Sequence, residues 1–206
     1  VKVFMGASTG TLLVQDDEGV EMVLRHTNRR ATFHSEDEYR LADRRPLARP
    51  GDWTSHPEVR DPQSAVQSTE RLIRIARKLG KRIHVLHVTT AQEVEILAAN
   101  KDVASMELTP QHLTLVGPEA YERLKGYAQM NPPIRDASHQ PGLWHAARYG
   151  IADVLGSDHA PHTREEKARP YPQSPSGMPG VQTLLPVMLN HVAAGRLSLE
   201  RLVDLT

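Results

Sequence analysis

The sequence predicts an α/β fold in which helices cover a parallel β-sheet. Short apolar runs typical of strands alternate with longer segments of helical periodicity along the 206 residues. This alternation favours parallel strands joined by helical crossovers. Apolar residues make up 39% of the chain and charged residues 24%, which is typical of a globular protein with one sizeable core. No internal repeat occurs beyond the recurring strand, loop and helix.

The elements follow in order along the chain. Strands are predicted at residues 1–5, 30–34, 82–87, 103–107 and 152–156. Helices are predicted at residues 18–27, 61–79, 90–99, 140–149 and 181–194, with another amphipathic helix from Leu199 onward. Loops are expected at residues 6–10, 109–112, 131–135 and 160–180, and residues 35–60 are expected to form an excursion over the surface. A loop as long as 160–180 is typical of a lid, so we expect it to border a substrate site and to be mobile in its middle.

The helix over residues 61–79 has the clearest boundaries. Asp61 can cap its start, Pro62 suits the first helical position, and Gly80 suits its end. An apolar stripe at helical spacing runs between these residues. The next helix opens on Thr90-Ala-Gln-Glu, which is a capping-box pattern.

Composition and charge exclude several classes of protein. The 25 basic and 25 acidic residues balance, so the chain lacks the basic excess that a general nucleic-acid-binding protein needs. No apolar run approaches the roughly 20 residues that span a bilayer. Cysteine is absent, which excludes disulfides and thiolate metal sites and fits the reducing cytoplasm. We therefore expect a cytoplasmic protein with one sizeable core.

Both ends of the sequence read as the interior of an element. Residues 1–5 resemble the middle of a buried strand, without an initiator methionine, and the final helix stops at Thr206. Natural domains seldom begin and end inside elements, because broken elements leave backbone groups unpaired. We expect the chain to be a piece of a longer polypeptide.

Polar residues recur where the predicted strands end. His34, His87, Glu107 and Asp158 each lie at or just after the carboxyl end of a strand. The loops of a (β/α)₈ barrel converge at those ends, and a doubly wound sheet also places its ligands there. This pattern therefore indicates a site but does not choose between the two architectures.

Imidazole and carboxylate groups are ligands that zinc accepts, and ligands from separate strands leave positions open for water. A strand-end histidine can equally be a hydrogen-bonded structural residue, so the spacing alone leaves a metal site undecided. His84 and His87 are three residues apart and face opposite sides of a strand. Only one of these two can point into the site.

Seven sequence blocks stand out in order along the chain: Lys2–Gly10, His34–Asp37, His84–Thr90, Glu107–His112, Met130–Arg135, Ser157–His162 and Gly177–Gly180. Together they resemble the dihydroorotase family, cyclic amidohydrolases of pyrimidine biosynthesis. The Asn-Pro-Pro-Ile-Arg and Asp-His-Ala-Pro-His blocks favour dihydroorotase over dihydropyrimidinase and allantoinase. The resemblance covers essentially the whole chain.

The resemblance implies a partial (β/α)₈ barrel of the metal-dependent hydrolase type, with strands four to eight present. Residues 1–206 would then be one incomplete barrel domain, with the upstream strands and the downstream end missing. The family's first strand carries a His-x-His pair of ligands, and no such segment occurs here. This departure puts in doubt whether these residues alone could bind two metal ions.

The resemblance also implies a binuclear zinc centre. Lys2 matches the lysine that is carboxylated and bridges both zinc ions, and His34 and His87 match the histidine ligands of the next two strands. Asp158 matches the aspartate that binds one zinc ion and shuttles a proton during the reaction.

Substrate contacts are implied in the same way. His162 matches a residue that contacts the substrate carboxylate, Asn131 one that hydrogen-bonds the ring, and Pro179 and Gly180 would offer backbone groups to it. Gln111 stands where many relatives have a second histidine. The implied reaction is the reversible cyclisation of carbamoyl aspartate to dihydroorotate.

Two other functions stay open. One is a related cyclic amidohydrolase that acts on hydantoins, dihydropyrimidines or allantoin. The other is a non-catalytic subunit that scaffolds a partner such as aspartate carbamoyltransferase, although such a subunit has no need of the four ligand matches. The resemblance is compatible with a homo-oligomer and with an association with aspartate carbamoyltransferase.

Overall fold

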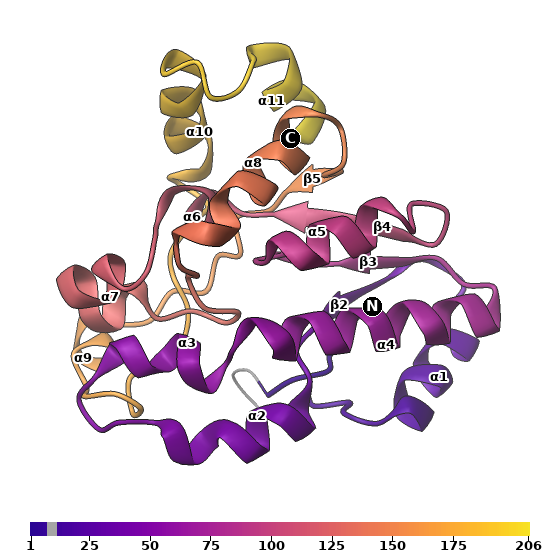
Figure 1. Cartoon of the computed structure of the whole chain (residues 1–206), viewed down its shortest axis with the longest axis horizontal. Helices are drawn as coiled ribbons and strands as arrows, with labels where there is room; N and C mark the ends of the chain where they lie inside the picture. Colours follow the sequence, from indigo (N-terminus) through magenta and orange to yellow (C-terminus); the bar gives the residue numbers. More distant parts are fainter. Residues whose placement is uncertain (8–11) are drawn as a thin grey trace.

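The computed structural model describes residues 1–7 and 12–206 and has an α/β architecture built on one parallel sheet (Figure 1). Residues 8–11, which include the second half of the predicted loop 6–10, lie outside the described residues. The strands are β1 (Lys2–Phe4), β2 (Ala31–His34), β3 (Ile83–Val85), β4 (Ala104–Leu108) and β5 (Val154–Leu155). All five predicted strands are confirmed, although every strand except β4 is shorter than predicted.

The order of the strands settles the choice that the sequence pattern left open. The described sheet runs β1-β2-β3-β4-β5, and every neighbouring pair is parallel. A doubly wound sheet reverses its strand order at a switch point, whereas a (β/α)₈ barrel adds each strand beside the previous one. The observed order is that of consecutive barrel units.

The predicted long helices are confirmed, and their ends follow the capping signals. They are α1 (Asp17–His26), α4 (Pro62–Leu79), α5 (Ala91–Ala98), α8 (Gln140–Arg148), α10 (Leu184–Ala193) and α11 (Leu199–Leu205). The Asp61 side chain accepts a hydrogen bond from Ser64 N, and Gly80 ends α4 with φ at +62°. Thr90 and Glu93 form the expected capping box of α5.

The expected surface excursion over residues 35–60 is correct only in part, because most of residues 42–51 are exposed but the segment has regular structure. This segment contains α2 (Glu38–Arg44), η1 (Arg45–Leu47), η2 (Trp53–Ser55) and α3 (His56–Val59). Ser55 and His56 are buried, so this part of the segment reaches the interior. Asp37 caps α2 and Asp52 caps η2. Each of the four elements is too short to show helical periodicity.

Three other short helices replace predicted loops or fall between predicted elements. The loop expected at 109–112 is the start of α6 (Pro110–Thr114), α7 (Glu119–Leu124) follows it, and α9 (Arg164–Lys167) lies in the middle of segment 160–180. The 3₁₀ turns η3 (Lys125–Ala128) and η4 (Ala137–His139) complete the described elements. Segment 160–180 is therefore not a loop without regular structure, and its mobility stays a prediction.

Two apolar clusters hold these elements together. The larger lies between the sheet and its helices, and Phe33, Leu72, Ile83 and Met106 are wholly buried in it. The smaller contains Ala120, Tyr121, Ala128, Met130 and Ile134. Figure 1 shows α3, α7 and α9 gathered at one end of the sheet. Among the described residues, no helix combines the length and apolar character needed to cross a membrane.

Candidate active site

A cavity of about 160 Å³ lies at the carboxyl ends of the strands. It is lined by Lys2, Phe4, His34, His87, Asn131, Asp158, Ala160, Ser176 and Gly177. The structure thus brings together the four predicted metal ligands and one predicted substrate residue. His84 is not among the lining residues and instead hydrogen-bonds Ser105 Oγ at 2.8 Å, so His87 is the member of that pair that faces the cavity.

The backbone at two lining residues has an uncommon conformation. His34 ends β2, whereas His87 and Asp158 lie beyond the ends of β3 and β5 and have φ angles of +38° and +41°. Residues other than glycine seldom adopt this left-handed conformation, and it is concentrated at functional sites. The turns after β3 and β5 aim both side chains at the space that His34 also faces.

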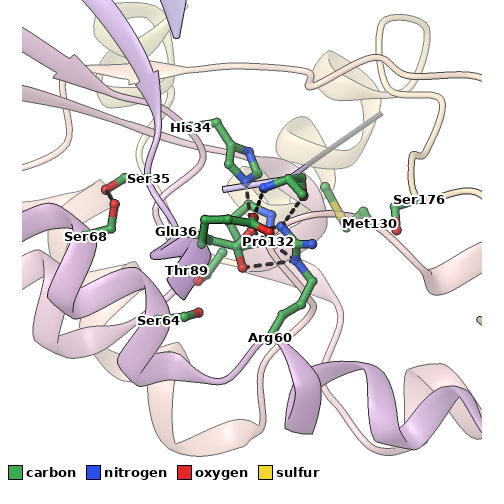
Figure 2. Close-up of polar contacts among 12 residues, drawn as sticks. His34, Ser35, Glu36, Arg60, Ser64, Ser68, Thr89, Met130, Pro132 and Ser176 are labelled. Atoms are coloured by element: carbon green, nitrogen blue, oxygen red, sulfur yellow. Dashed lines mark hydrogen bonds and ion pairs between the residues drawn. The ribbon is translucent and has the colours of Figure 1, made fainter. Parts of the chain in front are cut away.

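A chain of hydrogen bonds fixes the orientation of the His34 and His87 imidazoles, and Figure 2 shows its His34, Glu36 and Arg60 members. The buried Glu36 carboxylate accepts a hydrogen bond from His34 Nε2 at 2.8 Å. His34 Nδ1 therefore carries the lone pair and accepts from His87 Nε2 at 3.1 Å. This arrangement leaves His87 Nδ1 as a buried acceptor with no hydrogen-bond partner in the described part of the chain.

Glu36 is ionised because Arg60 lies against it. Arg60 Nε donates to Glu36 Oε2 at 3.1 Å, and Arg60 Nη2 donates to the same oxygen. Burial raises the pKa of Glu36, but the charge of Arg60 and the hydrogen bond from His34 outweigh burial and hold that pKa well below its usual value. Sequence reasoning gave Glu36 no role, although it lies two residues after His34.

Burial also sets the protonation of the groups around the cavity. It lowers the pKa of His87 well below its usual value, so this imidazole is neutral at neutral pH, which is the form that binds metal. Burial raises the pKa of Asp158, while the charge of Lys2 opposes that rise. It raises the pKa of Glu107 to about 7, and the Asp158 charge adds to the effect.

Glu107 lies behind the cavity and is held by the neighbouring strands. Its Oε1 accepts a hydrogen bond from the main-chain N–H of His87 at 3.2 Å. A Cβ atom at Gly156 would lie only 2.3 Å from Glu107 Cδ, so only glycine leaves room for this carboxyl group. The sequence placed Glu107 at a strand end without assigning it a function.

An irregular segment supplies the opposite side of the cavity through Asn131. Side chains from distant parts of the chain bind its carbonyl groups: His56 Nε2 donates to Met130 O at 2.9 Å and His112 Nε2 to Pro132 O at 3.0 Å. Asn131 Oδ1 is buried and has no hydrogen-bond partner among the described residues. It is an acceptor that a ligand N–H could satisfy.

The other predicted substrate residues are not among those that line this cavity, although His162 contacts the lining residue Ser176. His162 Nε2 donates to Ser176 O at 3.2 Å, and the Gly180 N–H donates to His159 Nδ1 at 3.0 Å. Pro179 and Gly180 line a separate apolar cavity of about 220 Å³, together with Gln111. The substrate roles of His162, Pro179 and Gly180 therefore stay predictions.

The donors around the main cavity suit a metal ion without forming a complete set. Within residues 1–7 and 12–206, no three His, Asp or Glu side chains lie close enough together to hold a metal ion. The unpartnered, buried lone pair of His87 and the nearby Asp158 carboxylate nevertheless have the chemistry of zinc ligands. The predicted residues thus fit a metal centre as part of its ligand set.

Comparisons with known proteins give a consistent set of relatives. The chain is 35% identical over 214 residues to a protein from Halobacterium salinarum named dihydroorotase, covering 100% of the chain and 48% of that relative. It is 32% identical over 218 residues to a dihydroorotase from Methanosarcina mazei, covering 100% of the chain and 47% of that relative. The chain spans about half the length of the curated relatives it matches. No family model matches it.

Solved structures agree with the architecture. The L-hydantoinase (dihydropyrimidinase) from Arthrobacter aurescens superposes with a TM-score of 0.89 at 27% sequence identity, covering 99% of this chain and 48% of that one. The D-hydantoinase (dihydropyrimidinase) from Thermus sp. superposes with a TM-score of 0.90 at 24% identity, covering 99% of this chain and 47% of that one. The second match supports the fold alone.

Proposed function

The chain belongs to the cyclic amidohydrolases, whose dihydroorotases it matches over about half of their length, and we propose that it forms part of a zinc-dependent dihydroorotase. The observation that carries this proposal is the cavity where Lys2, His34, His87 and Asp158 meet. The substrate would be dihydroorotate in the hydrolytic direction and carbamoyl aspartate in the biosynthetic direction.

His34, His87, Asp158 and a carboxylated Lys2 would hold the zinc ions of this enzyme. A carbamate on Lys2 would give two anionic oxygens where an ammonium group would repel the cations. Bound zinc would lower the pKa of a bound water and polarise the ring amide carbonyl of the substrate. The neutral His87 and the ionised Glu36 behind His34 support these ligand roles, because both imidazoles already have fixed tautomers.

Asp158 would move the proton in this reaction. Its carboxylate would accept a proton from the attacking water and deliver it to the departing amide nitrogen. Burial raises the pKa of Asp158, which favours a group that must both accept and release a proton near neutral pH. General acid–base catalysis of this kind contributes about 10²–10⁴-fold.

Asn131 would orient the substrate ring. Its buried, unpartnered Oδ1 can accept a hydrogen bond from a ring N–H. His162 would contact the substrate carboxylate, and the backbone of Pro179 and Gly180 would contact the ring. Both assignments require segment 160–180 to turn these groups toward the cavity, because His162 now hydrogen-bonds Ser176 O.

We further propose that residues 1–206 form one incomplete barrel domain that carries strands four to eight, and that the protein is cytoplasmic. Its half-length match to the curated relatives supports the first of these statements. A homo-oligomer or an association with aspartate carbamoyltransferase is proposed on the family resemblance alone.

Residues 1–206 contain no match to the family's first-strand ligands, so the test is ring opening by the purified full-length polypeptide that carries them, on dihydroorotate, a hydantoin, a dihydropyrimidine and allantoin, with zinc content measured on the same sample. We expect dihydroorotate to be the best substrate and chelation to abolish its turnover. A preference for hydantoin or dihydropyrimidine would favour the related cyclic amidohydrolases, which the hydantoinase superpositions support. Zinc-free protein that turns over none of the four would favour the scaffold function.

A further inference from the structure

A buried lysine lies in the middle of segment 160–180 and has no role in the proposed chemistry. Lys167 is the last residue of α9 and is only 5% exposed. The capping box of Thr163 and Glu166 fixes the start of this helix. A Cβ atom at Gly126 would lie 2.2 Å from Lys167 O, so the helix end packs directly on η3.

The Lys167 ammonium group binds three main-chain carbonyls from two separate segments. Its Nζ donates to Gln129 O at 3.0 Å, to Pro175 O at 2.8 Å and to Gly177 O at 2.8 Å. Gln129 lies just before Asn131, and Gly177 itself lines the cavity. One side chain therefore joins the two irregular segments that face the predicted metal ligands.

Other contacts run between the same two segments. Gly177 N donates to Gln129 O at 2.9 Å, and Gln129 Nε2 donates to Ser174 O at 2.8 Å. Removal of Lys167 would leave these contacts in place but would leave the Pro175 and Gly177 carbonyls without this donor.

The chemistry of the contact explains why the residue is lysine. Only an ammonium group carries three N–H donors on one atom, so it can serve three carbonyls that converge on one point. Glutamine offers two donors, and the planar guanidinium of arginine directs its donors outward in a fork. None of the three hydrogen-bonded partners is a carboxylate, and burying such a charge is costly. A geometric function of the contact explains why that cost is tolerated.

We propose that Lys167 is a positioning residue that holds Asn131 at a fixed distance from Ser176 and Gly177 and thereby sets the shape of the substrate cavity. Its effect on substrate binding rests on the proposed function, whereas its effect on the two segments does not. The two effects can therefore be measured separately.

The test compares Lys167→Met with Lys101→Met in the full chain. Lys101 is a matched control because its Nζ also binds a main-chain carbonyl, that of Ile151 at 2.9 Å, and the Asp153 carboxylate, away from the cavity. Hydrogen exchange should accelerate about tenfold or more at residues 129–135 and 174–178 in Lys167→Met and should stay unchanged there in Lys101→Met. With dihydroorotate, KM should rise about tenfold with a much smaller change in kcat, since the lost contacts orient the bound substrate.

Two further variants test the three-donor geometry. Lys167→Gln keeps two donors, so exchange in the same two segments should rise by less than in Lys167→Met; it also provides the measurement if the methionine variant does not fold. Lys167→Arg keeps the charge and should behave like Lys167→Met. Wild-type exchange in Lys167→Met or Lys167→Gln would overturn the proposal, as would full rescue by arginine. Faster exchange in a protein that does not turn over dihydroorotate would support the positioning role and overturn the proposed function.

Discussion

The cavity has two walls that are built in different ways. One wall, which we call the strand wall, is formed by parallel strands and the turns directly after them. Its residues are Lys2, His34, His87 and Asp158. The other, the loop wall, is formed by segments without strands and consists of Asn131, Ser176 and Gly177. Side chains such as His56, His112 and Lys167 hold these segments by hydrogen bonds to main-chain carbonyl groups. Hydrogen bonds between the main chains of neighbouring strands survive most substitutions. A wall held by side chains depends on the identity of each of those side chains. The strand wall is therefore suited to chemistry, and the loop wall to selecting and orienting a substrate.

The largest effect is expected at Asp158 in the strand wall. Asp158→Asn keeps the size and shape of the side chain but removes the base, so turnover of dihydroorotate should fall about 10²–10⁴-fold, equivalent to about 2.7–5.5 kcal/mol of barrier. Asparagine still offers a carbonyl oxygen to a metal ion, so zinc content should fall less than activity. Near-normal hydrolysis by this variant would remove Asp158 from the catalytic role and weaken the functional contrast between the walls.

A second large effect is expected behind the strand wall, at Arg60. Arg60→Met leaves the buried Glu36 carboxylate without its guanidinium partner and with only the hydrogen bond from His34, and breaking a buried ion pair on one side costs about 3–5 kcal/mol. Urea denaturation measures the loss. The matched control is Arg25→Met, which removes the more exposed pair with Glu21 and should cost at most about 1 kcal/mol. Equal losses in both variants would show that the Glu36 pair does not support the wall.

Acid should act on the loop wall through its buried histidines. Burial lowers the pKa of both His56 and His112 to about 4, whereas an unfolded histidine titrates near 6.5. Between pH 4 and pH 6.5 the unfolded chain therefore binds more protons than the folded one. The contribution of each neutral histidine to the free energy of unfolding is fully present above pH 6.5 and is lost as the pH falls toward 4. At pH 5 each histidine should account for roughly 2 kcal/mol of lost stability.

The His56 share of this loss can be isolated. His56→Gln keeps a donor for the Met130 carbonyl but cannot titrate, so denaturation curves at pH 7 and pH 5 should differ by about 2 kcal/mol less than in the wild type. The exposed His145 provides the control, because His145→Gln should leave the difference unchanged. An unaltered difference in His56→Gln would mean that acid does not act through this residue.

The smallest effect is expected at Tyr121, which supports the same wall with a neutral hydroxyl. Tyr121 Oη donates to Ile134 O at 3.2 Å, so Tyr121→Phe should destabilise the protein by about 1 kcal/mol. Thermal denaturation measures this loss, with the exposed Tyr149→Phe as the neutral control. Hydrogen exchange near Ile134 should also increase. If Tyr121→Phe changed neither the thermal stability nor the exchange near Ile134, the carbonyl contacts of the loop wall would not act individually.

The sequence predicted the strand wall well and the loop wall poorly. The strands and the long helices α4 and α5 have strong apolar periodicity and capping residues, and these local signals predicted the elements that carry the wall. The choice of Lys2 as one of its members came from the family resemblance. The alternation of side chains also predicted correctly that only one of His84 and His87 faces the cavity, although His87 lies beyond the end of β3.

The loop wall carries no comparable local signal. Helices as short as α3 and α9 make about one turn, so hydrophobic periodicity cannot reveal them. The contacts that matter also join distant residues: His56 lies 74 positions from Met130, and Lys167 lies 38 positions from Gln129. A single sequence does not show which lysine or histidine will be buried against which carbonyl.

The order of the strands has a consequence for how the protein is made. Lys2 comes from the first described strand, and Asp158 follows the last. A nascent chain synthesised as far as β4 would already hold His34 and His87 beside each other, yet it would lack the carboxylate that completes the strand wall. Domains fold largely as their residues leave the ribosome, so the cavity closes only after nearly all of its supporting units have emerged. A metal ion that needed Asp158 would therefore be retained only after β5 and the turn that follows it had left the ribosome.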